Sequence, residues 1–560
     1  MPWTRHCWQA QRGNHDKVPG QTNRKGRDVT PQLQAAWRKA GYWRDLTFDQ
    51  AFADAAARRP DALLTLHSAE RPATLRLTDL RAEGQRLAGA LAAVGLVAGD
   101  VVAVQLPNWA ELPMVFQAAA ALGCVILPIV SIYGQHELSY VLRNSRAKIL
   151  FVPGQWRKID YVDRALKAGP CPDLKTIVMV GEGELHDEKV MPWTEFAARG
   201  RIVPSPAISA DDPAFMVYTS GTTADPKGVL HSGNSFLAEI WQANPDSDPD
   251  SVVMSPYPSG HVAGAISMLT HSAAARRTIV FDVWDPVAAA CYVESEGVTH
   301  TSGTPFHYLG LLDAAEAAGS NISSLRACGT GGATVPESLI ERAERLGIHL
   351  FRRYGMSEHP TVTQGVDGDP LDKRRSTDGQ AREGVEVRIV DDDGNDLPVG
   401  SEGEVATRGP DMYIGYTDPA LTAAASLPDG WYLSGDIGRL DEDGFLAITD
   451  RKKDVIIRGG ENISSREVEE LLLTLPGVRE AAAVGYPDER LGERICAFLI
   501  AGPGVSVDVP MVDAAFRALG VARQKTPERI VMADDLPRTA AGKVKKAELR
   551  QRLKAGEFAD

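Results

Sequence analysis

A hydroxyl-rich loop at residues 218–228 carries the clearest sign of chemistry in this sequence. It follows an apolar run at 214–217, and it packs five hydroxyl side chains and Lys227 into eleven positions. Backbone N–H groups in such a loop can bind an anion, and the lysine adds a positive charge. The loop is not a Walker motif, because Pro226 precedes the lysine and Gly228 follows it. Taken alone, an ordinary turn explains the loop equally well.

Further polar segments follow predicted strands. Residues 329–333 are rich in glycine and come after a strand predicted at 325–328, where a flat ligand can lie against bare backbone. Residues 354–358 place an aromatic ring, a hydroxyl and a carboxylate after a strand predicted at 348–353, and such a carboxylate can hold Mg²⁺ beside phosphates. Asp436 lies in a predicted turn, where it can accept hydrogen bonds from ribose hydroxyls.

Two more segments lie near the C-terminus, at residues 458–463 and 537–544. The first is centred on a glycine pair, and the second contains Lys543. A lone lysine in such a position is usually solvated, and each segment alone fits a surface loop. The order of all six segments along the chain is therefore the informative feature.

The elements that must position these segments alternate between strand and helix. Proline after aspartate at 285–286 opens one helix, and Thr334 can cap another that runs to residue 346. This alternation predicts an α/β fold, with a large domain of helix-covered, mostly parallel sheets. Predicted strands lie at 101–106, 124–129, 214–218, 278–281, 298–301 and 325–328, and a predicted helix lies at 111–122.

The pattern changes after residue 450. Ser464 and Glu467 have the spacing of a capping box, and a helix, two strands, a further helix and a last strand follow. We therefore predict a polar extension at 1–40, a large domain at 41–450 and a small, mobile α+β domain at 451–560. The charged run at 450–454 marks their junction.

Composition narrows the class of protein. The 560 residues include 60 basic and 74 acidic ones, and the net charge of −14 argues against a nucleic-acid binder. Six scattered cysteines without paired spacing fit the reducing cytoplasm. The basic first 30 residues lack the apolar core of a secretory signal, and the apolar stretch at 112–133 is interrupted by proline and glycine, so we predict no transmembrane segment.

Together and in this order, the segments resemble the adenylate-forming superfamily of acyl-CoA synthetases, peptide-synthetase adenylation domains and luciferases. The resemblance covers roughly residues 45 to 550. It implies an ATP-dependent acid–CoA ligase that forms an acyl-adenylate and pyrophosphate, and then acyl-CoA and AMP. The implied acid is fatty, alicyclic or aromatic, as in fatty-acid and lipid metabolism.

The resemblance also assigns roles to residues. In the family, the first loop wraps the phosphates of ATP, the glycine segment and an aromatic ring enclose adenine, and an aspartate and an arginine hold ribose. Glu358 matches the glutamate that holds Mg²⁺. Catalytic roles fall on Lys543, Glu358, Thr219 and His261. The implied ATP-binding residues are Thr219, Ser220, Gly221, Thr222, Thr223, Lys227, Gly331, Gly332, Ala333, Tyr354, Gly355, Ser357, Asp436, Arg451 and Lys543.

The family lysine that matches Lys543 approaches both the carboxylate and the α-phosphate. Two anions must meet in that step, so a positive charge and Mg²⁺ offset their repulsion. The family's small domain then turns about a hinge, which falls on Lys453 here. That rotation brings the coenzyme A segment, here Gly459, Gly460 and Glu461, to the site. His261 matches a residue that gates the acyl pocket, although a buried structural histidine explains it equally well.

Some points depart from the family or stay open. Ala224, Ser357 and Ser465 replace the family's usual glycine, threonine and proline. The alternatives are an acyl-AMP ligase that serves a carrier protein, for which no carrier domain is visible after residue 550, and a catalytically silent nucleotide-binding regulator. A luciferase-like oxygenase is more remote. The acid itself, the role of the first 40 residues and whether the chain forms a homo-oligomer are not readable from the sequence.

Overall fold

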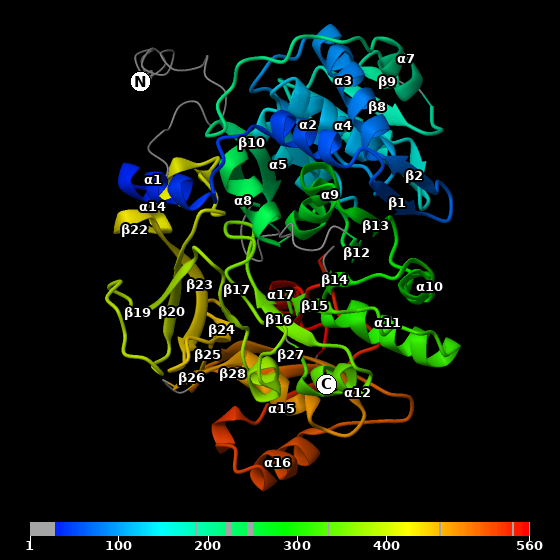
Figure 1. Ribbon diagram of the computed structural model, residues 1–560. Coiled ribbons are helices and arrows are strands. Elements are labelled where there is room, and N and C mark those ends of the chain that lie inside the picture. The colour runs from blue at the N-terminus through cyan, green and yellow to red at the C-terminus, as the bar shows by residue number, and fades with distance from the viewer. Residues whose placement is uncertain are drawn as a thin grey trace, which may run out of the picture.

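The computed structural model describes residues 29–184, 187–219, 226–243, 250–333, 335–458, 461–539 and 542–558. Large sheets that contain many parallel strand pairs alternate with helices, so the predicted α/β class is confirmed (Figure 1). Two large sheets are stacked in the upper and middle parts of the view, and a C-terminal unit lies at the bottom.

The upper layer is a sheet in which β10 follows the parallel strands and pairs antiparallel with β11. Its central strands are short, buried and rich in valine and isoleucine, as expected of parallel strands covered on both faces. Among the described residues, its spatial order is β21 (Gly415–Tyr416), β11 (Gly228–Ser232), β10 (Pro213–Tyr218), β4 (Val125–Pro128), β3 (Val101–Val104), β5 (Ile149–Pro153), β8 (Thr176–Val180) and β9 (Val190–Pro192).

The middle layer is a second sheet, parallel from β1 to β16. Helix α8 (Gly233–Ala243) packs on β10 and β11, and α9 (Val262–Ala274) packs on β12 and β13, so this helix pair separates the two sheets. Across the described ranges its order is β18 (Gln380–Ala381), β17 (Thr363–Gln364), β16 (Leu350–Tyr354), β15 (Ala327–Gly331), β14 (His300–Gly303), β12 (Val252–Ser255), β13 (Arg277–Phe281), β1 (Leu63–His67) and β2 (Ala73–Arg76).

The remaining helices cover these layers or fill the connections between them. Asp285 caps α10 through two backbone N–H groups, as its position before a proline predicts. These helices are α2 (Phe48–Arg58), α3 (Leu77–Ala93), α4 (Glu111–Ala121), α5 (Gln135–Ser145), α6 (Tyr161–Leu166), α7 (Trp193–Ala198), α10 (Pro286–Glu296), α11 (Pro305–Ala318), α12 (Glu337–Arg345), α13 (Leu371–Ser376) and α14 (Pro419–Ala424).

A third, antiparallel sheet precedes the C-terminal unit. It contains β19 (Glu386–Val390), β20 (Gly403–Arg408), β22 (Ser426–Leu427), β23 (Trp431–Leu440) and β24 (Leu446–Arg451). The C-terminal unit, orange and red in Figure 1, has its own sheet and its own apolar core. It contains β25 (Ile456–Arg458), β26 (Glu461–Ile463), β27 (Val478–Asp488), β28 (Gly492–Ala501), β29 (Arg529–Met532), α15 (Ser465–Leu473), α16 (Val509–Ala518) and α17 (Lys546–Lys554).

The end of the predicted N-terminal extension is structured. Helix α1 (Pro31–Ala40) begins at the Thr30 cap and buries Trp37 against Trp43 and Ala238. Arg38 adds ion pairs to Asp45 and Asp211. Apolar contacts therefore dock this helix onto the large unit, whereas residues 1–28 lie outside the described part.

Three local expectations need correction. Strand β15 continues through Gly331, so residues 329–331 belong to the strand and not to a turn after it. Asp436 lies within β23 and not in a turn, because Gly435, with φ +73°, keeps the chain in the sheet through an irregular register. Helix α12 begins after Pro336, whereas the predicted cap Thr334 lies outside the described residues.

The apolar stretch at 112–133 divides into α4 and β4, as expected. Within the described residues, none of the helices combines the length and the apolar character that crossing a membrane requires.

Candidate functional site

Lys543 reaches from the C-terminal unit to the end of strand β15. A Cβ atom on Gly332 would lie 3.1 Å from Lys543 Cε, and Gly332 has φ +77°. Any other residue there would strain the backbone because of this positive φ, and its side chain would have to share the space with the end of the lysine. The neighbouring Gly542 lies against Thr304, where a Cβ would be 3.6 Å from Oγ1. The lysine is thus inserted between the two units.

The charges around Lys543 place it among the other predicted site residues. Burial and the charge of Arg451 lower its pKa, Asp436 and Glu358 act in the opposite direction, and the result is about 8. Lys543 therefore lies within electrostatic range of both carboxylates. These groups come from β23, from the segment after β16 and from the C-terminal unit.

Asp436 is held by two of its predicted partners. Its Oδ2 accepts a 2.8 Å hydrogen bond from Tyr354 Oη, and its Oδ1 accepts a 2.9 Å hydrogen bond from Arg451 Nε. Arg451 lies opposite Asp436 in the ladder between β23 and β24. The structure thus joins the predicted adenine-side ring and the predicted ribose-side pair in one network.

Glu358 lies in an aromatic enclosure that sequence reasoning missed. Tyr416 Oη donates a 2.6 Å hydrogen bond to its Oε1, and Tyr432 Oη lies 3.3 Å from Tyr416 Oη. Lys227 Nζ lies 5.1 Å from the Tyr416 ring centroid, which brings the predicted phosphate loop to the same place. Glu358 Oε2 makes no hydrogen bond or ion pair with a described residue.

The structure shows fewer contacts for the other predicted site residues. Thr219 N donates to Lys227 O at 3.0 Å and so closes the ends of the loop. Glu461 begins β26 and is exposed, and Lys453 lies in the turn after β24, where burial lowers its pKa. The predicted residues that lie outside the described part are Ser220, Gly221, Thr222, Thr223, Gly459 and Gly460.

The turn after β16 is built around Gly355. A Cβ there would collide with Pro360 O, so the chain can fold back tightly only at a glycine. Ser357 O faces the His231 ring, with Nε2 at 2.8 Å. Gly331 and Ala333, at the end of β15, border the place that Lys543 reaches through Gly332.

His261 precedes α9 and faces Lys543. Burial and the lysine charge lower its pKa to about 3, so the imidazole is neutral near pH 7. Its Nδ1 is enclosed and has no hydrogen-bond partner among the described residues. The adjoining wall includes Tyr257, whose ring lies 5.5 Å from the His307 ring. A neutral, polar group thus borders an aromatic region.

The junction between the units is held by buried charges. Asp450 Oδ2 and Oδ1 accept hydrogen bonds from the backbone N and the hydroxyl of Ser465, at 2.6 and 3.0 Å. Within the C-terminal unit, Lys546 Nζ lies 2.8 Å from Ser465 Oγ and Arg550 pairs with Asp454 at 2.6 Å, which fixes the side of that unit that faces Asp450. Ser465, one of the departures noted above, is thus the centre of this junction.

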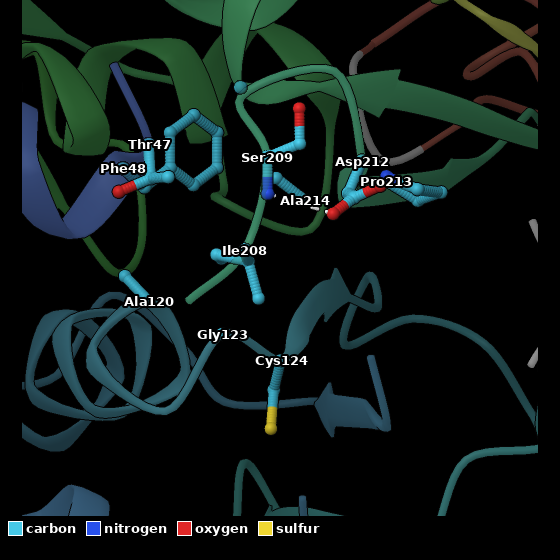
Figure 2. A pocket seen from close by; sticks show the side chains of 11 residues that line it. Thr47, Phe48, Ala120, Gly123, Cys124, Ile208, Ser209, Asp212, Pro213 and Ala214 are labelled. Carbon is cyan, nitrogen blue, oxygen red and sulfur yellow. Dashed lines mark hydrogen bonds between the residues drawn. The ribbon is translucent and has the colours of Figure 1, made fainter. Parts of the chain in front are cut away.

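A separate pocket lies at the other end of β10 (Figure 2). Pro213 and Ala214, which begin β10, line it together with Phe48, Gly123 and Ile208. Because Thr219 follows the opposite end of that strand, about 17 Å away, this pocket is not part of the site.

The site can now be compared with known proteins. Residues 52–417 match the family model of the AMP-binding enzymes, and residues 467–543 match the model of the AMP-binding enzyme C-terminal domain. The first match alone spans more than half of the chain. The chain belongs to the AMP-binding enzyme family.

Individual relatives support the same conclusion. A medium-chain fatty-acid–CoA ligase of Escherichia coli K12 is 37% identical over 535 residues, or 93% of each chain. A 3-[(3aS,4S,7aS)-7a-methyl-1,5-dioxo-octahydro-1H-inden-4-yl]propanoyl:CoA ligase of Mycobacterium tuberculosis is 35% identical over 490 residues, covering 85% of this chain and 93% of the relative. ATP-bound MatB of Rhodopseudomonas palustris superposes with a TM-score of 0.78 at 27% identity, covering 91% and 99% of the two chains. This AMP-binding enzyme is an acid–thiol ligase of the acyl-CoA synthetase type.

The pKa of Lys543 gives this AMP-binding enzyme a testable pH dependence. The charged lysine is the form that can neutralise a phosphate, so we expect kcat/KM for adenylation to fall as the pH rises through about 8. Bound ATP adds negative charge and raises that pKa, so kcat should fall only at higher pH. Pyrophosphate exchange measured from pH 6 to 10 gives the pH at which kcat/KM falls and the pH at which kcat falls. If both fall at the same pH, the assignment of this pKa to Lys543 is contradicted.

Proposed function

We propose that this enzyme activates a fatty, alicyclic or aromatic carboxylic acid as its acyl-adenylate at the site around Lys543, and then transfers the acyl group to coenzyme A. The observation that carries this proposal is the convergence of Lys543, from the C-terminal unit, on Asp436 and Glu358 of the large unit. A mobile cation beside two fixed carboxylates fits a reaction that must bring anions together.

In the proposed first step, a carboxylate oxygen of the acid attacks the α-phosphorus of ATP, an O–P bond forms, and pyrophosphate leaves. Lys543 offsets the charge of the carboxylate and the α-phosphate. The hydrogen-bonded pair of Asp436 and Arg451 supports ribose, and the Tyr354 ring lies beside it to stack on adenine. Thr219 and Lys227, which a backbone hydrogen bond joins, are proposed to lie beside the departing pyrophosphate.

Glu358 fits the Mg²⁺ that this chemistry calls for. One of its oxygens is fixed by Tyr416, and Oε2 has no partner among the described residues. Mg²⁺ in such sites binds one or two carboxylates together with substrate phosphates. Bound there, the ion would supply positive charge at the phosphates. Tyr416 and Tyr432 would hold the carboxylate in place and exclude water from one side.

In the proposed second step, the thiol sulfur of coenzyme A attacks the acyl carbonyl, the thiol loses its proton, and AMP leaves. We propose that the unit at 451–560 turns about Lys453 to remove Lys543 and bring Gly459, Gly460 and Glu461 to the acyl group. The separate apolar core of that unit supports movement as one body. His261, neutral and beside the aromatic wall, is proposed to border the acyl group.

The expected acid resembles those of the relatives. The ligase of Mycobacterium tuberculosis is named for an alicyclic acid with two ketone groups, and that of Escherichia coli for medium-chain fatty acids. The scattered cysteines support the prediction that the enzyme acts in the cytoplasm.

A two-part assay tests the proposal. We expect pyrophosphate exchange into ATP that requires both an acid and Mg²⁺, and acyl-CoA formation once coenzyme A is added. EDTA should abolish exchange, and added Mg²⁺ should restore it. Exchange without thioester would favour the carrier-protein ligase, and no exchange with a panel of fatty, alicyclic and aromatic acids would favour the silent regulator.

A further inference from the structure

One charged side chain beside the site is not used by the proposed mechanism. Arg353 lies on β16, next to Tyr354, and a Cβ atom on Gly329 of the neighbouring strand would collide with Arg353 Nε. Its guanidinium thus lies across the bare backbone of β15. The reason for glycine at position 329 is therefore the space that this arginine occupies.

Two other acidic side chains of this region have a direct partner, although Arg352 Nε, like Arg353 Nε, is enclosed without a hydrogen bond to a described residue. Glu239 forms an ion pair with Arg382 at 2.5 Å and accepts a 2.8 Å hydrogen bond from Thr361. Asp411 lies 3.0 Å from the His359 ring. All of these side chains are buried or nearly so. Glu239 is therefore already satisfied by its own arginine.

Arg353 has no such match. Its Nε is enclosed without a hydrogen-bond partner, and none of the described acidic residues forms an ion pair with it. Its charge is compensated at longer range by Glu239, which is already paired with Arg382, and by the Phe351 ring, whose centroid lies 5.6 Å from the guanidinium carbon. The Arg353 side chain is half-buried and forms no direct hydrogen bond or ion pair with the described residues, so its guanidinium can bind an oxygen acceptor from outside the chain.

The surroundings of Arg353 belong to the aromatic region beside His261. Its charge acts on Tyr257 and on Tyr308, two rings of that region. Tyr308 Oη already donates towards Thr301 O and Gly329 O, at 3.0 and 3.2 Å. Two polar groups of this wall, His261 Nδ1 and the Arg353 guanidinium, thus have nitrogen atoms without a hydrogen-bond partner among the described residues, and the guanidinium is the charged one.

The strand fixes how far this charge lies from the reacting centre. Lys543 lies against Gly332, directly after β15, and Arg353 crosses Gly329, three residues earlier. Three fully extended residues span about 10 Å, which is the upper limit of this separation along the chain. A ligand whose carboxyl group lies at Lys543 would therefore bring its far end, and not its middle, to Arg353.

We infer that Arg353 is a specificity-determining residue that binds an oxygen acceptor, carboxylate or carbonyl, at the far end of the acid substrate. Dicarboxylic and oxo-carboxylic acids of medium length are thus preferred over unsubstituted fatty acids. This inference rests on the proposed function and narrows its substrate class. A bidentate guanidinium suits both acceptors, and the carboxylate adds charge.

The test compares three acids of equal chain length: octanoic acid, octanedioic acid and an oxo-octanoic acid with the ketone at the penultimate carbon. For the wild type we expect kcat/KM in pyrophosphate exchange to be roughly 10- to 100-fold higher for an oxygenated acid than for octanoic acid. A higher value for the diacid alone identifies the acceptor as a carboxylate, and a higher value for the ketone identifies it as a carbonyl.

Variants locate the effect. Arg353→Met should remove or reverse the preference, and Arg353→Lys should keep part of it for the diacid. Arg352→Met is the matched control, because the neighbouring arginine is buried towards the opposite face of β16; it should change all three acids alike. If thermal unfolding shows that Arg353→Met does not fold, the test rests on the kcat/KM ratios of the wild type and of Arg353→Lys.

Exchange with octanoic acid as the best substrate, and unchanged ratios in Arg353→Lys and Arg353→Met, would overturn the inference while leaving the ligase activity intact. Absence of exchange with every acid would instead remove the proposed function on which the inference rests.

Discussion

Replacing Lys543 with alanine is expected to lower acid-dependent pyrophosphate exchange by about 10²–10³-fold, the usual loss when one group that stabilises transition-state charge is removed. The structure places this side chain beside Gly332 and within range of Asp436 and Glu358, so alanine would remove the cation that is proposed to lie between the α-phosphate and the attacking carboxylate. Exchange kinetics with saturating ATP measure the loss.

The second half-reaction separates this role from a structural one. With supplied acyl-adenylate and coenzyme A, Lys543→Ala should form thioester at a rate near that of the wild type. Lys545→Ala is the matched control, since Lys545 lies in the same segment but makes only a loose pair with Glu548, at 3.7 Å. An equal loss of both half-reactions in Lys543→Ala would refute the two-step division of labour.

The largest effect on stability is expected from Arg382→Met. Arg382 and Glu239 form an ion pair whose side chains are 4% and 3% exposed, and Thr361 holds the other oxygen of the glutamate. Removing one partner leaves a buried charge uncompensated, which typically costs about 3–5 kcal/mol. Denaturant unfolding followed by circular dichroism measures the change in unfolding free energy.

Two further variants serve as comparisons for the stability of Arg382→Met. Arg199→Met removes an exposed pair with Glu195, and its cost should stay below about 1 kcal/mol. The double variant Arg382→Met with Glu239→Leu should recover part of the lost stability, because no charge is then left alone. A single-variant cost as small as that of Arg199→Met would show that the buried pair does not stabilise the fold.

The sequence predicts best what lies at strand ends. Gly331, Tyr354 and Glu358 stand in short segments at or just after the ends of β15 and β16, and the parallel architecture brings such segments to one edge. Strand positions followed from apolar runs between turn residues. The end of β15 and the strand position of Asp436 could not be predicted in this way. Glycine-rich segments are typical of turns, but glycine also continues a strand where a neighbouring group must approach closely.

Sequence reasoning missed the groups that act through distant partners. Tyr416 lies 58 positions from the Glu358 that it binds, and His359 lies 52 positions from Asp411. Arg353 stands directly before Tyr354, and its importance follows only from the pairing of the charges around it. The one available signal was the presence of two adjacent arginines in an otherwise buried strand.

The hydrogen bonds of Ser465 bear on the order in which substrates are met. Asp450 precedes the proposed pivot at Lys453, whereas Ser465 follows it, so a rotation of the small unit is expected to break the two hydrogen bonds between them. We propose that these hydrogen bonds favour the orientation that presents Lys543, and that contacts formed in the other orientation offset their loss. An enzyme held in this way would meet ATP and the acid first, and formation of the adenylate would be the event that admits the thiol.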